Sequence, residues 1–140
     1  MTERLKAWDT NFLVRHLVED DIEQLAVVRR ELRQAELSGV PVWIADVTIV
    51  ETFWVLQQVF GLSMKQALEC LAALTRDGRF LFQSGEDVSR AIERSNKKGD
   101  LPEHLVAFAA KRAGAIKTQT FDRAVRGLSE FEVLGTRKVG

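Results

Sequence analysis

The sequence predicts an α/β protein: a three-layer α/β/α sandwich with a central, mainly parallel sheet of about five strands. Short apolar runs of strand length alternate along the 140 residues with longer segments that have helical periodicity. These runs contain few polar residues, as expected for parallel strands that are buried on both faces. The length fits one domain and no linker-like stretch divides the chain, so we expect a single domain over residues 1–140.

The first part of the chain predicts three strands, each followed by helical sequence. The strands are the apolar runs 5–8, 42–45 and 80–82. Helical patterns begin near residues 10, 20, 48 and 63, each at a Ser, Thr, Asn or Asp, the residue types preferred as helix caps. The cap of the first helix is predicted to be Thr10 or Asn11. Breaks between helices are predicted at Gly39, Pro41 and Gly61.

The remaining sequence predicts three helices and two strands. Helical patterns cover residues 86–97 and 100–112, and glycines at 99 and 114 follow them. The second pattern is the clearest helix of the chain, because Leu101, Leu105 and Phe108 fall on one stripe. Residues 115–118 and 131–134 predict a fourth and a fifth strand, separated by a short helix over 121–128.

The charges cancel over the whole chain but not within its parts. Twenty Lys and Arg balance 20 Asp and Glu, and a neutral chain ordinarily speaks against nucleic-acid binding. Residues 1–89 hold 9 basic and 14 acidic residues, a net charge of −5, whereas residues 90–140 hold 11 and 6, a net charge of +5. The C-terminal third can therefore meet a polyanion although the total charge is zero.

Cysteine content and hydropathy indicate the compartment. Cys70 is the single cysteine, so no intrachain disulfide can form, and its apolar neighbours predict a buried structural thiol. No leader pattern is visible at the N-terminus, and no apolar run reaches the roughly 20 residues of a membrane helix. We therefore expect a cytoplasmic protein without a membrane segment.

Five acidic residues interrupt apolar sequence where strands end or helices begin. Because the carboxyl ends of parallel strands meet at one sheet edge, such acids can converge there. An acid among core residues is costly to bury unless it is paired or binds a metal, and oxygen donors favour Mg²⁺ or Mn²⁺. The candidates for catalysis and metal binding are Asp9, Glu51, Asp100, Glu103 and Asp122.

Each of these acids also has a structural interpretation. Asp9 and Asp122 are placed to cap the helices that follow them, and Glu51 can lie on a solvated helix face. Asp100 and Glu103 form an Asp-x-x-Glu pattern that is similar to a capping box. The joint placement of the five acids, rather than any single one, predicts a shared site.

Four short sequence motifs contain the five acids. Residues 9–11 are Asp-Thr-Asn, residues 49–54 are Ile-Val-Glu-Thr-Phe-Trp, residues 99–105 are Gly-Asp-Leu-Pro-Glu-His-Leu, and residues 120–122 are Thr-Phe-Asp. Together they resemble the PIN-domain family and, within it, the VapC-type toxins of toxin–antitoxin pairs. The third segment resembles the family's Ala-Asp-Phe-x-Asp-x-Leu, with Glu103 where many relatives have Asp. The resemblance covers nearly the whole chain at typical spacing.

The resemblance implies a metal-dependent endoribonuclease that is the toxin of a type II toxin–antitoxin pair. The five acids would then hold one or two Mg²⁺ (or Mn²⁺) ions, while Asn11 and Thr120 orient them by hydrogen bonds. It also implies an RNA substrate, a cognate antitoxin protein and a homodimer, for which the apolar helices around Trp54, Phe60 and Leu62 are the candidate contact surface. The basic residues that we consider for RNA contact are Arg15, Lys97, Lys98, Arg112 and Arg123.

Other interpretations stay open. His16 and His104 are conceivable general bases, but a packing or surface role is the simpler interpretation, and core packing is the default for Trp8, Trp43 and Trp54. One rival function is another Mg²⁺-dependent α/β phosphohydrolase, in which a strand-end Asp accepts a phosphoryl group. The other is a non-catalytic RNA- or protein-binding module whose carboxylates are structural.

Overall fold

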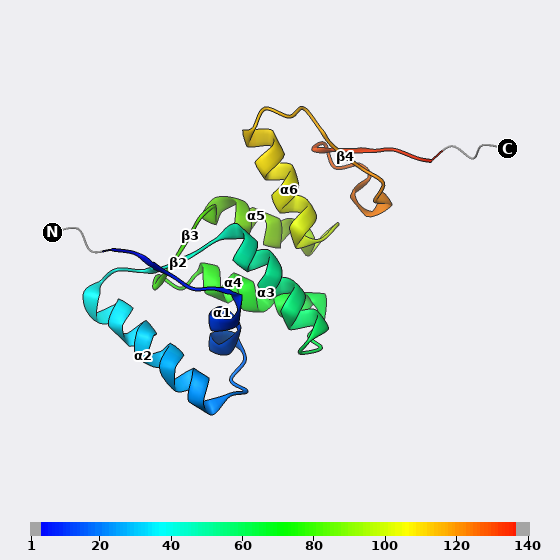
Figure 1. The fold of residues 1–140 in the computed structure, drawn as a ribbon. Helices are drawn as coiled ribbons and strands as arrows, with labels where there is room; N and C mark the ends of the chain where they lie inside the picture. The colour runs from blue at the N-terminus through cyan, green and yellow to red at the C-terminus, as the bar shows by residue number, and fades with distance from the viewer. Residues whose placement is uncertain (1–3, 137–140) are drawn as a thin grey trace. The chain divides into compact units, whose positions relative to one another are not determined.

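A computed structural model describes residues 4–136 of the chain. This part is α/β, as predicted, with six α-helices, one 3₁₀-helix and five strands. The chain divides into two compact units, residues 1–89 and 90–140, and the division falls within helix α5 (Gly85–Ser95). Each unit is described by itself below and can be followed in Figure 1. No helix within residues 4–136 is long and apolar enough to cross a membrane.

The first unit is built on a parallel sheet with the strand order β1–β2–β3. β1 (Lys6–Ala7) pairs with β2 (Val42–Ile44), and β2 pairs with β3 (Phe80–Phe82). Parallel neighbours need crossover connections, which helices supply here. The connecting helices are α1 (Thr10–Leu17) and α2 (Ile22–Ser38), then α3 (Asp46–Gln58) and α4 (Met64–Thr75). All three predicted strands of this part of the chain are confirmed.

Side-chain caps begin α1, α2 and α4, whereas α3 follows Ala45 without one and starts at Asp46, two residues before the predicted start. Ser63 caps α4 with a complete capping box, as predicted, and Asp21 caps α2 where the second helical pattern was predicted to begin. The predicted cap of α1 is wrong. Asp9, and not Thr10 or Asn11, accepts the hydrogen bond of the first turn, because it is the last residue with an extended backbone before the helix.

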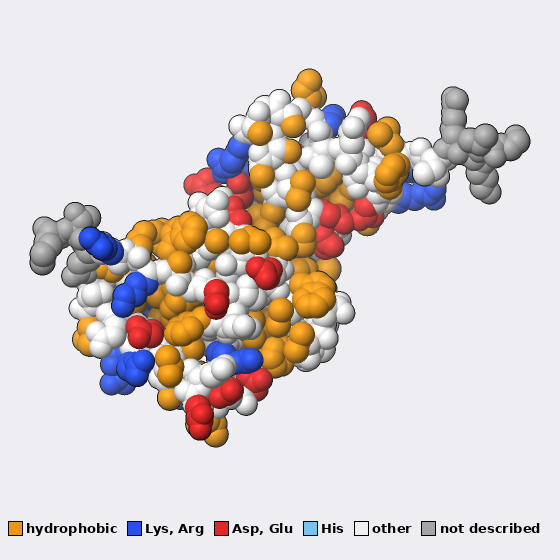
Figure 2. All heavy atoms as spheres, in the orientation of Figure 1, with side chains coloured by type: hydrophobic (Ala, Val, Ile, Leu, Met, Phe, Trp, Pro, Cys, Tyr) orange, Lys and Arg blue, Asp and Glu red, His pale blue; other side chains and the backbone are white. Residues whose placement is uncertain are grey.

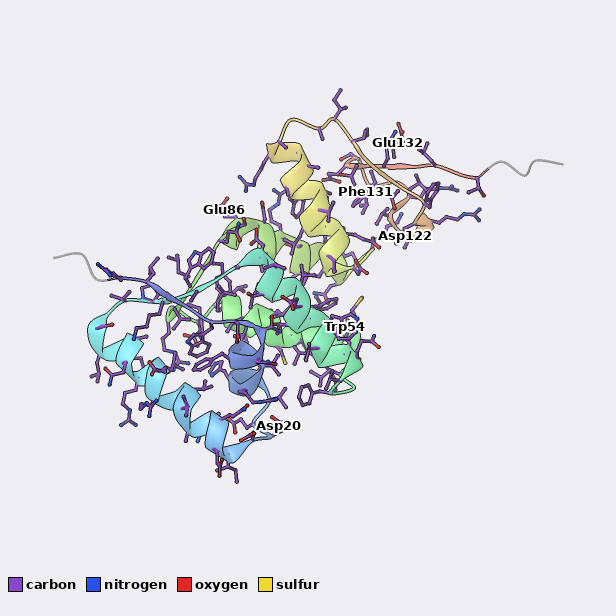
Figure 3. The ribbon with its side chains drawn as sticks, in the orientation of Figure 1. Asp20, Trp54, Glu86, Asp122, Phe131 and Glu132 are labelled. Atoms are coloured by element: carbon purple, nitrogen blue, oxygen red, sulfur yellow. The ribbon has the colours of Figure 1, made fainter. Side chains whose placement is uncertain are left out.

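The core of the first unit is formed by apolar side chains from its helices and its central strand. Leu13, Ile44, Leu56 and Leu71 are completely buried. The core prediction holds for Trp8, which is 7% exposed, but is wrong for Trp54, which is 59% exposed. The buried face of α3 consists of Thr48, Ile49, Thr52, Phe53 and Leu56, and Trp54 points to the opposite side (Figure 3). Cys70 is half-buried rather than buried, and burial raises the pKa of its thiol.

The second unit holds helix α6 and a parallel two-stranded sheet. β4 (Thr118–Thr120) pairs with β5 (Phe131–Val133), and α6 (Leu101–Arg112) contacts β4. The 3₁₀-helix η1 (Arg123–Val125) replaces the longer helix predicted over 121–128, because Arg126 already has an extended backbone. β4 lies further along the chain than predicted, since its pairing with β5 begins at Thr118. The small core of this unit contains Ala107, Val125 and Phe131.

The described strands thus lie in two parallel sheets, one of three strands and one of two. The parallel arrangement is confirmed. A single central sheet within a three-layer sandwich stays a prediction, and so does a single domain over residues 1–140.

The two units differ in charge. The boundary between them coincides with the point at which the sequence divides into an acidic part, with a net charge of −5, and a basic part, with a net charge of +5. Figure 2 shows side chains of both signs among hydrophobic ones on its visible face. The second unit therefore carries the positive charge that a polyanionic ligand requires.

Candidate active site

Asp9 stands at the carboxyl end of β1, as predicted for an acid at the sheet edge. Its Oδ1 accepts a hydrogen bond from the backbone N–H of Phe12 at 2.9 Å, which caps α1. The residue is exposed, and it shares a surface hollow with Asn11 and Arg15. Asp9 thus caps α1 through Oδ1, one of its two carboxylate oxygens.

Arg15, a candidate for RNA contact, is held by neighbours in the first unit. Its Nε donates to Gln24 Oε1 at 2.7 Å, and one terminal nitrogen donates to Asp20 Oδ1 at 2.9 Å. Figure 3 labels Asp20 at the end of the loop before α2. The guanidinium is therefore fixed near Asp9 rather than extended into solvent.

Glu51 is exposed on α3, which matches its solvated-face interpretation. An acid that sequence reasoning missed stands earlier in the same helix: Asp46, directly after β2. Its Oδ2 accepts a hydrogen bond from Ser84 Oγ at 2.8 Å, and its N–H donates to Gln83 Oε1 at 2.9 Å. Asp46 Oδ1 is buried and has no hydrogen-bond partner within residues 4–136. The signal that would have found Asp46 is its position, because it follows strand 42–44 as Asp9 follows the first strand.

The second unit brings together the other three predicted acids. Asp100 caps α6, with its Oδ1 accepting a hydrogen bond from Glu103 N at 3.2 Å. This is one half of the predicted capping box. The carboxyl group of Glu103 shares a hydrogen bond with the carboxyl group of Asp122, which caps η1. A helix start and a turn thus place two acids in contact.

The electrostatics of this pair are unusual. Burial, the hydrogen bond to Asp122 and the negative charges of Asp100 and Asp122 raise the pKa of Glu103 to about 7. The bond from Glu103 and a second one from Ala124 N, at 2.8 Å from Oδ1, hold the pKa of Asp122 below its usual range. Glu103 Oε2 is buried without a hydrogen-bond partner in the described part of the chain. The raised pKa of Glu103 and the lowered pKa of Asp122 together favour a proton on Glu103 and a negative charge on Asp122.

Of the predicted supporting residues of this unit, Thr120 contacts the pair. Thr120 Oγ1 accepts a hydrogen bond from Asp122 N at 3.0 Å, so Thr120 orients Asp122 through its backbone. Lys98 donates its ammonium hydrogen bond to the carbonyl oxygen of Arg126. Lys97 and Arg123 are exposed, and Arg112 lies in the last turn of α6.

The acidic pair fits a divalent cation. Within residues 4–136, no three His, Cys, Asp or Glu side chains are grouped as ligands of one ion. Mg²⁺, however, is commonly held by one or two carboxylates, with waters and substrate phosphates completing its shell. Glu103 and Asp122 supply such oxygens, and the orphaned Oε2 of Glu103 is the kind of acceptor that an ion satisfies.

Both histidines pack against aromatic rings. His16 is half-buried against the rings of Trp8 and Phe80, and burial, with the charge of Arg79, lowers its pKa. His104 is completely buried, and its Nε2 lies 2.6 Å from the carbonyl oxygen of Lys98. The His104 ring is therefore closed to a substrate, whereas His16 is partly exposed but packed between aromatic rings.

Within the second unit, the described geometry brings Asp100, Glu103 and Asp122 together, whereas Asp9, Glu51 and the additional acid Asp46 belong to the first unit. Comparisons with models of protein families, with curated proteins and with solved structures find no match to this chain. The similarity to PIN domains and VapC toxins consequently stays a prediction from the sequence motifs.

Proposed function

We propose that this protein is a metal-dependent endoribonuclease of the PIN-domain type, the toxin of a toxin–antitoxin pair, acting in the cytoplasm. The observation that carries the proposal is the contact between Glu103 and Asp122. Two carboxylates in contact repel each other, and either a shared proton or a bound cation removes the repulsion. The raised pKa of Glu103 and its orphaned oxygen support a site that exchanges the proton for Mg²⁺ or Mn²⁺.

In the proposed reaction, Glu103 and Asp122 would hold the ion with Asp100 beside them in the second unit, and the sequence motifs add Asp9 and Glu51 as predicted ligands. A bound Mg²⁺ supplies a water of lowered pKa and a positive charge for the scissile phosphate. Asp100 orients Glu103 by accepting the hydrogen bond of its N–H, and Thr120 does the same for Asp122. The basic second unit attracts the RNA backbone, with Lys97 and Arg123 exposed for phosphate contact.

The proposal extends to the fold, because the PIN-domain resemblance implies a fold as well as an activity. It therefore includes a single central sheet of about five strands, in the three-layer arrangement predicted from the sequence. Proposed partners are a second copy of the chain and an antitoxin. Exposed apolar residues on α3, Val47 at 63% and Trp54 at 59%, support an interface on that helix.

The test is an RNA cleavage assay with Mg²⁺, Mn²⁺ or a chelator. Asp9→Asn keeps the cap of α1, since Asn is an equally good capping residue, but removes the negative charge. We expect it to lose more activity than the roughly 10–100-fold that follows from changing an outer-shell residue. Asp21→Asn is the matched control, because it makes the same change at the cap of α2, and it should retain full activity.

Three other outcomes would contradict the proposal. Cleavage that survives both the chelator and Asp9→Asn would exclude a metal-dependent reaction at these acids. Hydrolysis of small phosphate esters without RNA cleavage would favour the phosphohydrolase. A stable protein that binds RNA but cleaves none in either metal would favour the non-catalytic binding module.

A further inference from the structure

The loop before α6 comes unusually close to Glu103. Gly99 in this loop has a φ of 78°, a conformation that side chains other than glycine rarely adopt. A Cβ at this position would lie 3.0 Å from His104 Nε2, 3.0 Å from Val125 Cγ1 and 3.3 Å from Glu103 Oε2. Glycine therefore allows the loop backbone to lie directly against the Glu103 carboxyl group.

Lys98 holds this loop in place: besides the bond of its backbone N–H to Arg94 O at 2.9 Å, it makes two further hydrogen bonds. The backbone carbonyl oxygen of Lys98 lies 2.6 Å from His104 Nε2, so that ring nitrogen carries the hydrogen and donates. The ammonium group of Lys98 donates to the carbonyl oxygen of Arg126, just after η1. The loop is thus tied to α6 on one side and to the turn that carries Asp122 on the other.

Packing alone does not account for an imidazole at position 104. The His104 side chain is fully buried, and its ring centroid lies 6.4 Å from that of Phe108 and 6.2 Å from that of Phe131. Its Nδ1 is buried and lacks a hydrogen-bond partner within residues 4–136, which is a cost that an apolar side chain would avoid. The feature that an apolar side chain could not supply is the hydrogen bond from His104 Nε2 to the carbonyl oxygen of Lys98.

We infer that His104 is a positioning residue of the proposed metal site: it locks the Lys98–Gly99 loop against Glu103 and so holds Glu103 and Asp122 ready to bind a divalent cation. This inference rests on the proposed function, which supplies the reason for a cation. His104 itself does not contact the ion or the RNA in this scheme. Its effect passes through the loop backbone to the carboxyl pair.

The experiment compares two substitutions of His104. His104→Gln retains a side-chain N–H donor for the Lys98 carbonyl, whereas His104→Leu retains the apolar volume without a donor. In metal-free protein we expect His104→Leu to speed amide hydrogen exchange at Glu103 by at least about 10-fold. The reason is that the backbone N–H of Glu103 is bonded to Asp100, which directly follows the loop that His104 holds. Mn²⁺ affinity, measured by calorimetry, should fall by about 10-fold or more. His104→Gln should restore both values to near those of the wild type.

Phe108→Leu is the matched control. Phe108 is buried at 4% exposure beside the His104 ring, so this change loosens the same core without touching the hydrogen bond. It should lower the thermal stability while Mn²⁺ affinity stays within about 2-fold of the wild type, a change of under half a kcal/mol.

The outcomes separate the inference from the proposed function. Equal Mn²⁺ affinity in His104→Leu and the wild type, or equal effects of His104→Gln and His104→Leu, would overturn the positioning role. A wild-type protein that binds Mn²⁺ and shows the expected pattern, yet cleaves no RNA, would support the positioning role and overturn only the ribonuclease. A wild-type protein that binds no Mn²⁺ would overturn both.

Discussion

The carboxyl group of Glu103 on α6 is hydrogen-bonded to the carboxyl group of Asp122, the cap of η1. Asp122 also accepts a hydrogen bond from the backbone N–H of Ala124, which stabilises its ionised form. Glu103 instead has a buried oxygen without a partner among the described residues, which disfavours its ionised form. The proton of the pair therefore resides on Glu103. This asymmetry governs how the unit responds to pH and to cations.

The pH dependence of stability should reveal the Glu103 proton. The folded-state pKa of Glu103 is raised from 4.5 to about 7, so ionisation of this group opposes folding. Its stabilising contribution is complete below a pH of about 4.5 and is lost as the pH rises through about 7. In metal-free buffer, Glu103→Gln should therefore gain stability relative to the wild type at pH 8 and gain none at pH 4. Thermal unfolding at both pH values measures the difference.

Asp122 affects stability in the opposite sense to Glu103, because its lowered pKa contributes stability that is lost as the pH falls.

The control for Glu103→Gln is Glu93→Gln, at an exposed position on α5. It should follow the wild-type curve at every pH. Parallel curves for Glu103→Gln and the wild type would show that Glu103 is not perturbed.

Gly99→Ala should cost more stability than Gly114→Ala. Both glycines have positive φ, 78° and 93°, so both substitutions introduce about 1–2 kcal/mol of backbone strain. A Cβ at Gly114 meets nothing within 4 Å, whereas one at Gly99 meets His104 and Val125 at 3.0 Å. We expect an additional loss of about 1–3 kcal/mol for Gly99→Ala, measured by urea unfolding. Equal losses would mean that the loop does not lie against α6.

Arg94→Leu should destabilise the protein through Glu130. An Arg94 terminal nitrogen lies 2.5 Å from Glu130 Oε1, and the Glu130 side chain is only 11% exposed. Burial acts to raise the pKa of Glu130, but hydrogen bonds from its own backbone and from Arg94 outweigh burial and hold it below its ordinary value. Without Arg94, the unfolding free energy at pH 7 should fall by about 1–3 kcal/mol, and by less at pH 4, where Glu130 can take up a proton.

An exposed ion pair provides the comparison for Arg94→Leu. Arg29 lies 3.2 Å from Glu19, and the two side chains are 63% and 58% exposed. Solvent screens such a pair, so Arg29→Leu should change the unfolding free energy by less than about 0.5 kcal/mol. A loss as large as that for Arg94→Leu would contradict the distinction drawn from burial.

Trp54→Ser should weaken self-association without weakening the fold. Trp54 is 59% exposed on α3, so its removal opens no core cavity, but it deletes the largest side chain of the proposed interface (Figure 3). Sedimentation should show a dimer dissociation constant raised by about 10-fold or more, equivalent to roughly 1.4 kcal/mol. Ile116→Ser, at a 91% exposed position of the second unit, should leave it unchanged. A monomeric wild type would refute the dimer.

Local features of the sequence predicted much of the fold. The capping residues Asp21 and Ser63 and the apolar runs at β1, β2 and β3 act on their immediate neighbours, so their effect can be read without knowledge of the tertiary structure. The short η1 and the exposed Trp54 were not predicted, because helix length and the buried face depend on which neighbouring elements pack against the segment.

By itself the sequence determined the order of strands and helices, the acidic and basic parts of the chain, and the set of five acids at strand ends and helix starts. Only the tertiary structure decided what those acids contact. Glu103 meets Asp122 rather than completing the capping box with Asp100, and Asp46 meets Ser84 across the ends of two strands. Such contacts join residues that are distant in the chain, and no local pattern encodes which of them the packing of the elements will bring within hydrogen-bonding distance.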